Sequence, residues 1–294
     1  MKILILGAYG LLGHKLFQRL GQEFDVYGTC RDMQTNAPWS HLFPGEKMQI
    51  GVRADYVDSV QMAIRKVHPD TVINAIGLVK QLEESKDPAL AITINALFPH
   101  KLALMCRQSG ARLIHFSTDC VFSGKKGMYK PEDVPDADDL YGRTKYLGEL
   151  NDEGSVTIRS SIIGRELGTK NGLVEWFLSN HGNVVKGYAN AIYSGFTTIE
   201  MSRIVSDILK NRPSLRGVWQ IASTPISKYD LLRLVEKKMD LRIGIEKDES
   251  VKINRSLDGS RYSQITGYKA PTWDSMIEEM AKDPTPYESY HQKV

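Results

Sequence analysis

The sequence predicts an α/β protein with a doubly wound parallel sheet and a smaller, interleaved C-terminal domain. Short apolar runs alternate with helical patterns through the first half of the chain, which favours a parallel sheet with helices on both faces. A glycine-rich turn follows the first apolar run. With 294 residues, 41% of them hydrophobic, the chain can bury a sizeable core. We expect residues 1–155 to form the first domain. Residues 156–294 should form most of the second, with some strands and helices returning to the sheet.

The expected elements follow from the spacing of apolar residues and from glycine and proline positions. In the first half we expect strands over 2–6, 25–30, 71–76 and 112–116, helices over 10–20, 58–67 and 89–107, and a loop over 33–46. In the second half we expect helices over 139–152, 173–178, 200–209 and 229–238, and strands over 156–159 and 217–222. The pattern is looser in the second half, so the boundary near residue 155 is soft.

The glycine-rich turn predicts a dinucleotide site. Gly7 allows a sharp turn, Gly10 lets the main chain approach a pyrophosphate, and Gly13 lets the following helix pack close to the strand. The amides and the positive dipole at the helix start would then face an anion. A Rossmann-type sheet is therefore expected, with the cofactor contacted by this turn: Gly7, Tyr9, Gly10, Leu11, Leu12 and Gly13.

The end of the second expected strand favours NADP over NAD. An acidic residue there would bind the ribose 2′-hydroxyl of NAD, but this chain has Cys30 followed by Arg31. A guanidinium can bind a 2′-phosphate at two points. Asp32 leaves a second interpretation open, because it could simply pair with Arg31.

Tyr141 and Lys145 are the candidate catalytic pair. Four residues apart on a helix, they share one face, and an ammonium near a phenol lowers the phenol's pKa so that it can exchange a proton. Such a pair also arises by chance in a chain with 13 tyrosines. Thr118 follows a strand and can donate to a carbonyl oxygen, or it is a turn or cap residue. Asn95 lies inside a helix, where it could anchor a water or face solvent.

Together these residues resemble the extended short-chain dehydrogenase/reductase family, and within it the dTDP-4-dehydrorhamnose reductase branch. The motifs that carry the resemblance are the glycine turn, Asn74 to Gly77, Asn95, Ser117 to Gly124, Tyr141 to Lys145, Gly148-Glu149 and Gly195 to Glu200. The resemblance implies catalytic roles for Thr118, Tyr141 and Lys145 and a supporting role for Asn95. It also implies cofactor contacts from Arg31, Ala75, Ile76 and Gly77, and from Asp55, which would contact adenine or cap the next helix. The substrate contacts it implies are Lys80, Asp119, Cys120, Val121 and Lys186.

The implied activity is an NADPH-dependent reduction of a nucleotide-linked 4-keto-6-deoxy sugar in surface polysaccharide precursor synthesis. Two departures bear on the substrate: Cys120 stands where the branch has a tyrosine, and Ser160-Ser161-Ile162 follows Arg159 in place of Thr-Ser-Trp. The run from 186 to 195 is similar to reductases of UDP-linked N-acetylated 6-deoxy-L-hexoses. Candidate cations for the substrate pyrophosphate, each of which could equally be a surface charge, are Arg165, Lys170, Lys186, Arg255 and Arg261. An epimerase on the same fold and a non-catalytic NADP-binding regulatory subunit remain alternatives.

Composition excludes other classes. A net charge of +3 is too small to indicate nucleic acid or an anionic membrane, and no apolar stretch is expected to reach the length of a membrane span. Three cysteines without metal-ligand spacing predict no metal site. The first strand begins at residue 2, so we expect no signal peptide and a cytoplasmic location. A homodimer is left open.

Overall fold

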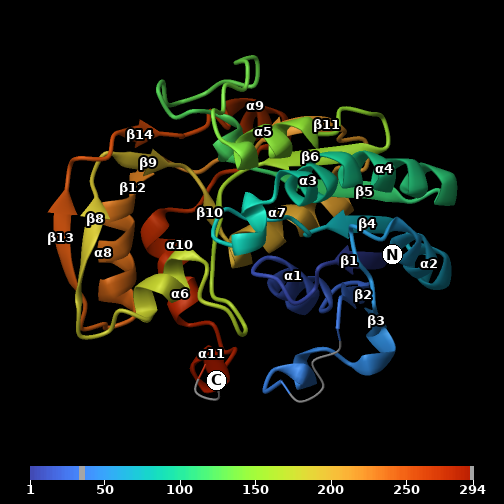
Figure 1. Cartoon of the computed structure of the whole chain (residues 1–294), viewed down its shortest axis with the longest axis horizontal. Coiled ribbons are helices and arrows are strands. Elements are labelled where there is room, and N and C mark those ends of the chain that lie inside the picture. The colour runs from blue at the N-terminus through green and yellow to red at the C-terminus, as the bar shows by residue number, and fades with distance from the viewer. Residues whose placement is uncertain (33–36, 292–294) are drawn as a thin grey trace.

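A seven-stranded parallel sheet forms the centre of the computed structural model, which describes residues 1–32 and 37–291 (Figure 1). In spatial order the strands are β11 (Gly217–Gln220), β6 (Ser155–Arg159), β5 (Arg112–Ser117), β4 (Thr71–Asn74), β1 (Lys2–Leu6), β2 (Asp25–Cys30) and β3 (Met48–Ile50). Every neighbouring pair is parallel. The predicted α/β fold class is confirmed.

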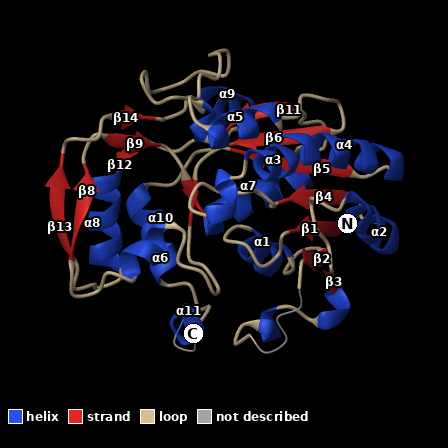
Figure 2. Cartoon of the chain, viewed as in Figure 1, coloured by secondary structure: helices blue, strands red, loops and turns tan. Residues whose placement is uncertain are grey.

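Strand β1 shows why both faces of the sheet must be covered. Successive side chains of a strand point to opposite faces, and all four apolar residues after Lys2 are buried. Ile3 and Ile5 join one core cluster with residues of α1 (Gly13–Leu20) and α7 (Thr198–Asn211). Leu4 and Leu6 join the cluster on the opposite face, with residues of α2 (Val57–Val67) and α4 (Phe98–Ser109) (Figure 2).

The single helix expected over 89–107 is three helical segments in sequence. They are α3 (Pro88–Ala91), a π-helical segment η4 (Ile92–Leu97) and α4. Asp87 caps the start by accepting from the amides of Ala89 and Leu90. Gly110, in the left-handed conformation with φ of 74°, ends the helix as predicted.

This helical stretch corrects one expectation. Over Pro88–Ser109 the chain is long and apolar enough, by length and composition only, to cross a membrane. About half of this stretch is buried inside the protein, where α4 packs against β5 and α2. The reason for the apolar composition is therefore its place against the sheet, as in a core helix.

The second half of the chain contributes both to this sheet and to a separate group of small sheets. Strands β6 and β11 lie in the main sheet, and α7 covers one face of it. The small sheets are β10–β7, β12–β9–β14 and β13–β8, built from β7 (Ile162–Ile163), β8 (Val184–Tyr188), β9 (Ala191–Tyr193), β10 (Phe196–Thr197), β12 (Ile226–Ser227), β13 (Gly244–Asp248) and β14 (Ile253–Asn254). The remaining helices of this half are α6 (Leu173–Leu178), α8 (Lys228–Lys238), α9 (Ser260–Thr266), α10 (Trp273–Ala281) and α11 (Tyr287–His291). The division at residue 155 stays a prediction.

Several predicted boundaries are wrong. The helix expected over 139–152 is only α5 (Leu140–Leu147), because the chain leaves the helix at Gly148. Helix α1 begins at Gly13 rather than at residue 10. In the loop expected over 33–46, residues 33–36 lie outside the described residues, and the described part holds two short 3₁₀ turns, η1 (Ser40–Leu42) and η2 (Gly45–Lys47). Strand β3 follows directly and was not predicted.

Candidate functional site

The candidate site lies where the strand order reverses, between β1 and β4. In such sheets ligands bind beyond the carboxyl ends of the strands at this switch point. The turn after β1 and the loop after β4 meet there: a Cβ on Gly7 would lie 3.0 Å from Cγ1 of Ile76 and 3.4 Å from the Ala75 backbone. Asn74 holds the second loop, because its side chain accepts from the Ile76 amide at 3.1 Å and donates to His115 Nδ1 at 3.1 Å.

The glycine turn has the features that a dinucleotide requires. Gly7 has φ of 82°, and a Cβ on Gly13 would lie 2.0 Å from the Gly7 oxygen, so both positions need glycine. At Gly10 a Cβ would meet only the Gly7 oxygen, at 3.3 Å, which leaves the main chain open to a close approach. Leu12 is in the core and Leu11 packs against it, so these two residues would contact a cofactor through their backbone.

Tyr9 connects this turn to the end of β2. Its ring packs edge-on against Phe43, with 4.7 Å between the centroids, and its hydroxyl lies near the Cys30 thiol. Burial, followed by the charge of Cys30, raises the pKa of Tyr9 to about 12. Tyr9 thus borders the predicted cofactor region as a neutral phenol.

The structure decides two alternatives near Arg31. Helix α2 has Tyr56 at its N-cap and no side chain caps it, so the capping role for Asp55 is wrong. Asp55 instead pairs with Arg53, which lowers the pKa of its carboxyl, and the charge of Arg31 adds to this effect. Within residues 1–32 and 37–291, no ion pair joins Arg31 to Asp32. Arg31 is exposed at the end of β2, where a 2′-phosphate contact was predicted.

Tyr141 and Thr118 come together because Gly142 lets α5 lie directly on the turn after β5. A Cβ on Gly142 would be 2.2 Å from the Cys120 oxygen and 2.5 Å from Ala137. Asp139 caps the helix by accepting from the Gly142 amide at 2.8 Å. The Thr118 side chain lies close enough to the Tyr141 phenol to lower its pKa.

The predicted lowering of the pKa of Tyr141 is wrong. Burial raises the pKa of this phenol well above its ordinary value, and the nearby Cys120, Asp119 and Asp139 raise it further. The nearby Thr118 side chain lowers it. Because burial has the largest effect, Tyr141 is a phenol that holds its proton firmly.

Lys145 is a buried cation beneath the loop after β4. Its residue is 5% exposed, and its ammonium donates to the Phe116 oxygen at 2.6 Å. Burial lowers its pKa to about 8, and Glu149 opposes this effect. A Cβ on Gly77 would lie 3.9 Å from Lys145 Nζ and 3.7 Å from Asn95 Oδ1, so these three predicted residues are neighbours.

Asn95 fixes the backbone of that same loop. It is 1% exposed, so the interpretation as a solvent-facing residue is wrong. Its Oδ1 accepts from the Leu78 amide at 2.8 Å, and its Nδ2 donates to the Leu78 oxygen at 2.9 Å and to Thr144 Oγ1 at 3.4 Å. Asn95 lies in the π-helical segment, a feature that often marks functional sites. A role in anchoring water stays a prediction.

The Thr118 hydroxyl is surrounded by partners from its own turn. It accepts from the Cys120 amide at 3.1 Å and lies 3.1 Å from Asp119 Oδ1. Burial raises the pKa of Asp119, while the charge of Arg255 lowers it. Burial likewise raises the pKa of the Cys120 thiol to about 12. Val121 is a correction: its side chain is fully buried against Phe122, so only its backbone could meet a substrate.

Lys80 lies over the ring of Tyr141. Its ammonium pairs with Asp139 at 2.5 Å and lies 5.5 Å from the centroid of the Tyr141 ring. It therefore connects the loop after β4 to the start of α5. This position brings a partly exposed positive charge beside Tyr141, and the substrate role of Lys80 stays a prediction.

Of the other predicted cations, only Arg255 reaches this region. It donates to the Phe122 oxygen at 2.9 Å, and its charge acts on Asp119 and Cys120. Lys186 is wrong as a residue of this site, because it lies exposed on the outlying β8–β13 pair and bonds to Asp248 at 3.2 Å (Figure 1). Arg165 pairs with Glu175, and Arg261 lies over the Trp219 ring.

The sequence identified Gly148-Glu149 as a motif but assigned no role to either residue. Gly148 lets the end of α5 abut η4, because a Cβ there would be 2.0 Å from the Asn95 oxygen. Glu149 pairs with buried Arg159 at 2.6 Å and accepts from Ser117 at 2.6 Å, which ties α5 to β5 and β6. The Gly148-Glu149 step was visible as a motif, but only packing reveals what it holds.

Several known proteins resemble this chain in sequence or in fold. A family model described as the RmlD substrate binding domain matches residues 1–179. SpsK, a spore coat polysaccharide biosynthesis protein of Bacillus subtilis, is 25% identical over 83% of this chain and 81% of its own length. A dTDP-4-dehydrorhamnose reductase of Mycobacterium tuberculosis is 33% identical, over 50% of this chain and 44% of that protein.

Solved structures share the fold. The dTDP-4-dehydrorhamnose reductase of Bacillus anthracis, in complex with NADP, superposes with a TM-score of 0.77 at 19% identity, covering 95% of this chain and 98% of that one. Two further matches bear on the alternatives. WbmG of Bordetella bronchiseptica, in complex with NAD, has a TM-score of 0.75 at 17% identity over 96% and 93% of the two chains. Methionine adenosyltransferase 2 subunit beta of Xenopus tropicalis is 27% identical over 55% of this chain and 47% of its own.

The matched family model spans more than half of the chain, and its range includes the glycine turn, Tyr141 and Lys145. The chain belongs to the RmlD substrate-binding domain family, whose members include NAD(P)H-dependent reductases of the extended short-chain dehydrogenase/reductase type.

Proposed function

We propose that this protein is an NADPH-dependent reductase of a nucleotide-linked 4-keto-6-deoxy sugar, acting in surface polysaccharide precursor synthesis. The observation that carries the proposal is the packing of the start of α5, with Tyr141, on the turn that holds Thr118, together with Lys145 buried next to Gly77 in the loop after β4. The name of the Bacillus subtilis relative supports the pathway. We place the enzyme in the cytoplasm, because its three cysteines are free thiols.

The residues of this chain would act on the carbonyl oxygen. The nicotinamide of the cofactor, when bound, supplies the hydride to the keto carbon. Reduction leaves negative charge on the oxygen, which Thr118 can stabilise by a hydrogen bond and Tyr141 can neutralise with its phenolic proton. The raised pKa keeps Tyr141 protonated until that charge develops. Lys145 would contact the cofactor ribose and supply a positive charge below the phenol.

The thymidine- and uridine-linked substrates remain two candidates for this site. Similarity to dTDP-4-dehydrorhamnose reductases supports the first. Cys120 in place of the family's tyrosine, and Ser161 and Ile162 in place of Ser-Trp, support a differently shaped sugar such as an N-acetylated one. Lys80 and Arg255 are the cations that we assign to the substrate, since both lie beside Tyr141 or Asp119.

A panel assay tests the proposal. Purified protein is mixed with NADPH and with dTDP- and UDP-linked 4-keto sugars, and the loss of NADPH absorbance is followed. We expect turnover with one class. The Tyr141→Phe variant should bind NADPH normally and lose activity by about 10²–10⁴-fold, the size of general acid catalysis. Unchanged turnover in that variant would remove Tyr141 from the mechanism.

A regulatory subunit is the second candidate, supported by the match to methionine adenosyltransferase 2 subunit beta. Tight NADPH binding without oxidation by any member of the panel would favour it. An epimerase would convert a nucleotide sugar with no net change in NADPH.

A further inference from the structure

His14 lies directly behind the glycine turn, in the first turn of α1. The residue is fully buried. Its Nδ1 is 2.9 Å from the Gly10 oxygen, and its Nε2 is 2.9 Å from the hydroxyl of Tyr287. A residue near the C-terminus is thus two hydrogen bonds away from the centre of the predicted pyrophosphate site.

The donor and the acceptor of each hydrogen bond between Gly10, His14 and Tyr287 can be assigned. Burial lowers the pKa of His14 to about 4, so the ring is neutral at physiological pH. The Gly10 oxygen can only accept, so Nδ1 carries the ring proton and Nε2 must accept. The Tyr287 hydroxyl therefore donates to His14, and its second neighbour, Asp283, is more distant at 3.4 Å.

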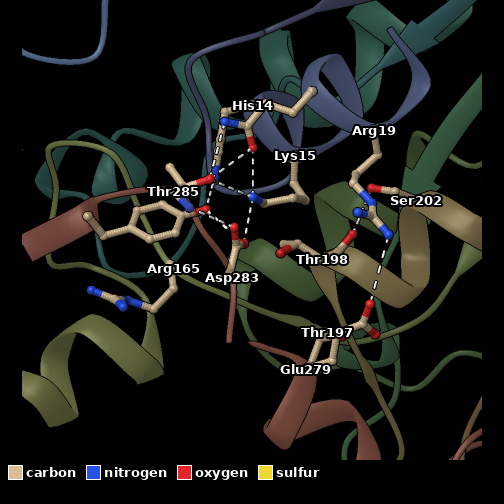
Figure 3. A network of polar contacts seen from close by, with 12 residues as sticks. His14, Lys15, Arg19, Arg165, Thr197, Thr198, Ser202, Glu279, Asp283 and Thr285 are labelled. Atoms are coloured by element: carbon tan, nitrogen blue, oxygen red, sulfur yellow. Dashed lines mark hydrogen bonds and ion pairs between the residues drawn. The ribbon is translucent and has the colours of Figure 1, made fainter. Parts of the chain in front are cut away.

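The segment that carries Tyr287 is held firmly against α1. Lys15 and Asp283 form a buried ion pair at 2.6 Å, and Lys15 also donates to Thr285 at 3.3 Å. The Arg165 guanidinium lies 4.7 Å from the Tyr287 ring centroid. Figure 3 shows Lys15 pointing toward Asp283, with Thr285 beside His14 and Arg165 on the other side of the network.

Peptide geometry links this network to ligand binding. A trans peptide is planar, so its oxygen and its N–H point in opposite directions. With the Gly10 oxygen held toward His14 by both the His14 amide at 3.1 Å and the ring, the Leu11 N–H points away from His14. In the described part of the chain, that N–H has no hydrogen-bond partner. It is an orphan donor at a helix start, the kind of group that binds phosphate oxygens.

We propose that Tyr287, acting through His14, positions the Gly10–Leu11 peptide and so sets the affinity of the glycine turn for a dinucleotide. Tyr287 and His14 are positioning residues. The inference rests on the proposed function only in that a dinucleotide binds at this turn. It gives the C-terminal segment a role in cofactor binding, which neither the fold nor the glycine motif implies.

The test is NADPH binding by the full chain, measured by quenching of intrinsic fluorescence. Tyr287→Phe removes the hydroxyl and keeps the ring that packs on His14 and Arg165. We expect the Kd for NADPH to rise about five- to tenfold, as for the loss of one hydrogen bond. The KM for NADPH should rise in parallel, while kcat at saturating NADPH stays unchanged. The matched control is Tyr290→Phe, since that hydroxyl reaches only His41 at 3.4 Å; its Kd should equal the wild-type value.

A double-mutant cycle shows whether Tyr287 acts through His14. In a His14→Leu background, Tyr287→Phe should cause no further loss of NADPH affinity. Additive losses, or equal Kd values for the Tyr287→Phe and Tyr290→Phe proteins, would overturn the inference while leaving the proposed function intact. If wild-type protein binds neither NADPH nor NADH, both proposals fail. If the His14→Leu protein does not fold, the comparison of the Tyr287→Phe and Tyr290→Phe proteins alone tests the inference.

Discussion

At the scale of single residues, the site depends on groups held in unfavourable surroundings. Lys145 is a buried ammonium with one hydrogen bond, and its nearest predicted partners are the neutral Asn95 and Gly77. The spacing of Tyr141 and Lys145 predicted that both lie on one helix face. Their pKa values could not be predicted, because burial, which the sequence does not reveal residue by residue, dominates both.

Replacing Lys145 should stabilise the protein while abolishing activity. The pKa of Lys145 falls from its ordinary 10.5 to about 8 on folding, so the charged form is disfavoured in the native state. Lys145→Met should therefore raise the free energy of unfolding at pH 7 by about 1–3 kcal/mol, measured by urea unfolding. Between pH 8 and 10.5 the unfolded wild-type chain binds more protons than the folded one. The free energy of unfolding of the wild-type protein therefore increases with pH in this range, and the difference in stability between the variant and the wild type should decrease. A constant difference across this range would argue against a buried charge.

Arg31 should decide between the two cofactors. In Arg31→Ala we expect the Kd for NADPH to rise about 10- to 100-fold, as for the loss of a charge-assisted hydrogen bond, with the Kd for NADH unchanged. The control is Arg53→Ala, since Arg53 already pairs with Asp55. Equal losses for NADPH and NADH would place Arg31 away from the 2′-phosphate.

At the scale of elements, glycines determine how closely α5 approaches its neighbours. Gly142 contacts the turn after β5, and Gly148 contacts η4. The sequence predicted the four longer strands of the first half because each holds several apolar residues between turn residues. It did not predict β3, with three residues, or the end of α5, because such short elements carry too little periodicity and are fixed by their neighbours.

Gly142→Ala separates packing from helix propensity. Alanine within a helix is favoured over glycine by about 0.5–1 kcal/mol, but its Cβ would lie 2.2 Å from the Cys120 oxygen. The clash is with backbone and should dominate, giving a net loss of about 1–3 kcal/mol in unfolding free energy. A reduced kcat should accompany it, since Tyr141 moves relative to Thr118. Gly45→Ala, where a Cβ meets nothing within 4 Å, is the control. A Gly142→Ala protein that is more stable than wild type would contradict the close approach.

At the scale of the whole molecule, the C-terminal segment closes onto the first helix. Residues 283–290 contact α1 and the segment around Arg165, so the two ends of the chain support the same turn (Figure 1). The main sheet was predictable from alternation, and the candidate residues beside it from motif order. The small sheets were not, because their two- to five-residue strands pair across long sequence separations.

The Lys15–Asp283 pair should be a major contributor to this closure. Asp283→Asn leaves a buried ammonium without its counter-ion, which should cost about 3–5 kcal/mol of unfolding free energy, measured by chemical denaturation. A Lys15→Met and Asp283→Leu double variant should recover most of it, since neither charge remains. Glu249→Gln, which breaks the exposed pair with Lys247, should have no measurable effect. Equal changes in the free energy of unfolding for Asp283→Asn and Glu249→Gln would show that the buried Lys15–Asp283 pair does not stabilise the protein.

The transfer of deuterium from deuterated NADPH to the sugar, read by mass spectrometry, tests the central claim most directly. We predict that the wild-type protein places one deuterium on C4 of a nucleotide-linked 4-keto sugar, and that Tyr141→Phe binds the same cofactor but transfers almost none. A converted sugar that carries no deuterium, or equal transfer by the two proteins, would contradict a reductase in which Tyr141 supplies the proton.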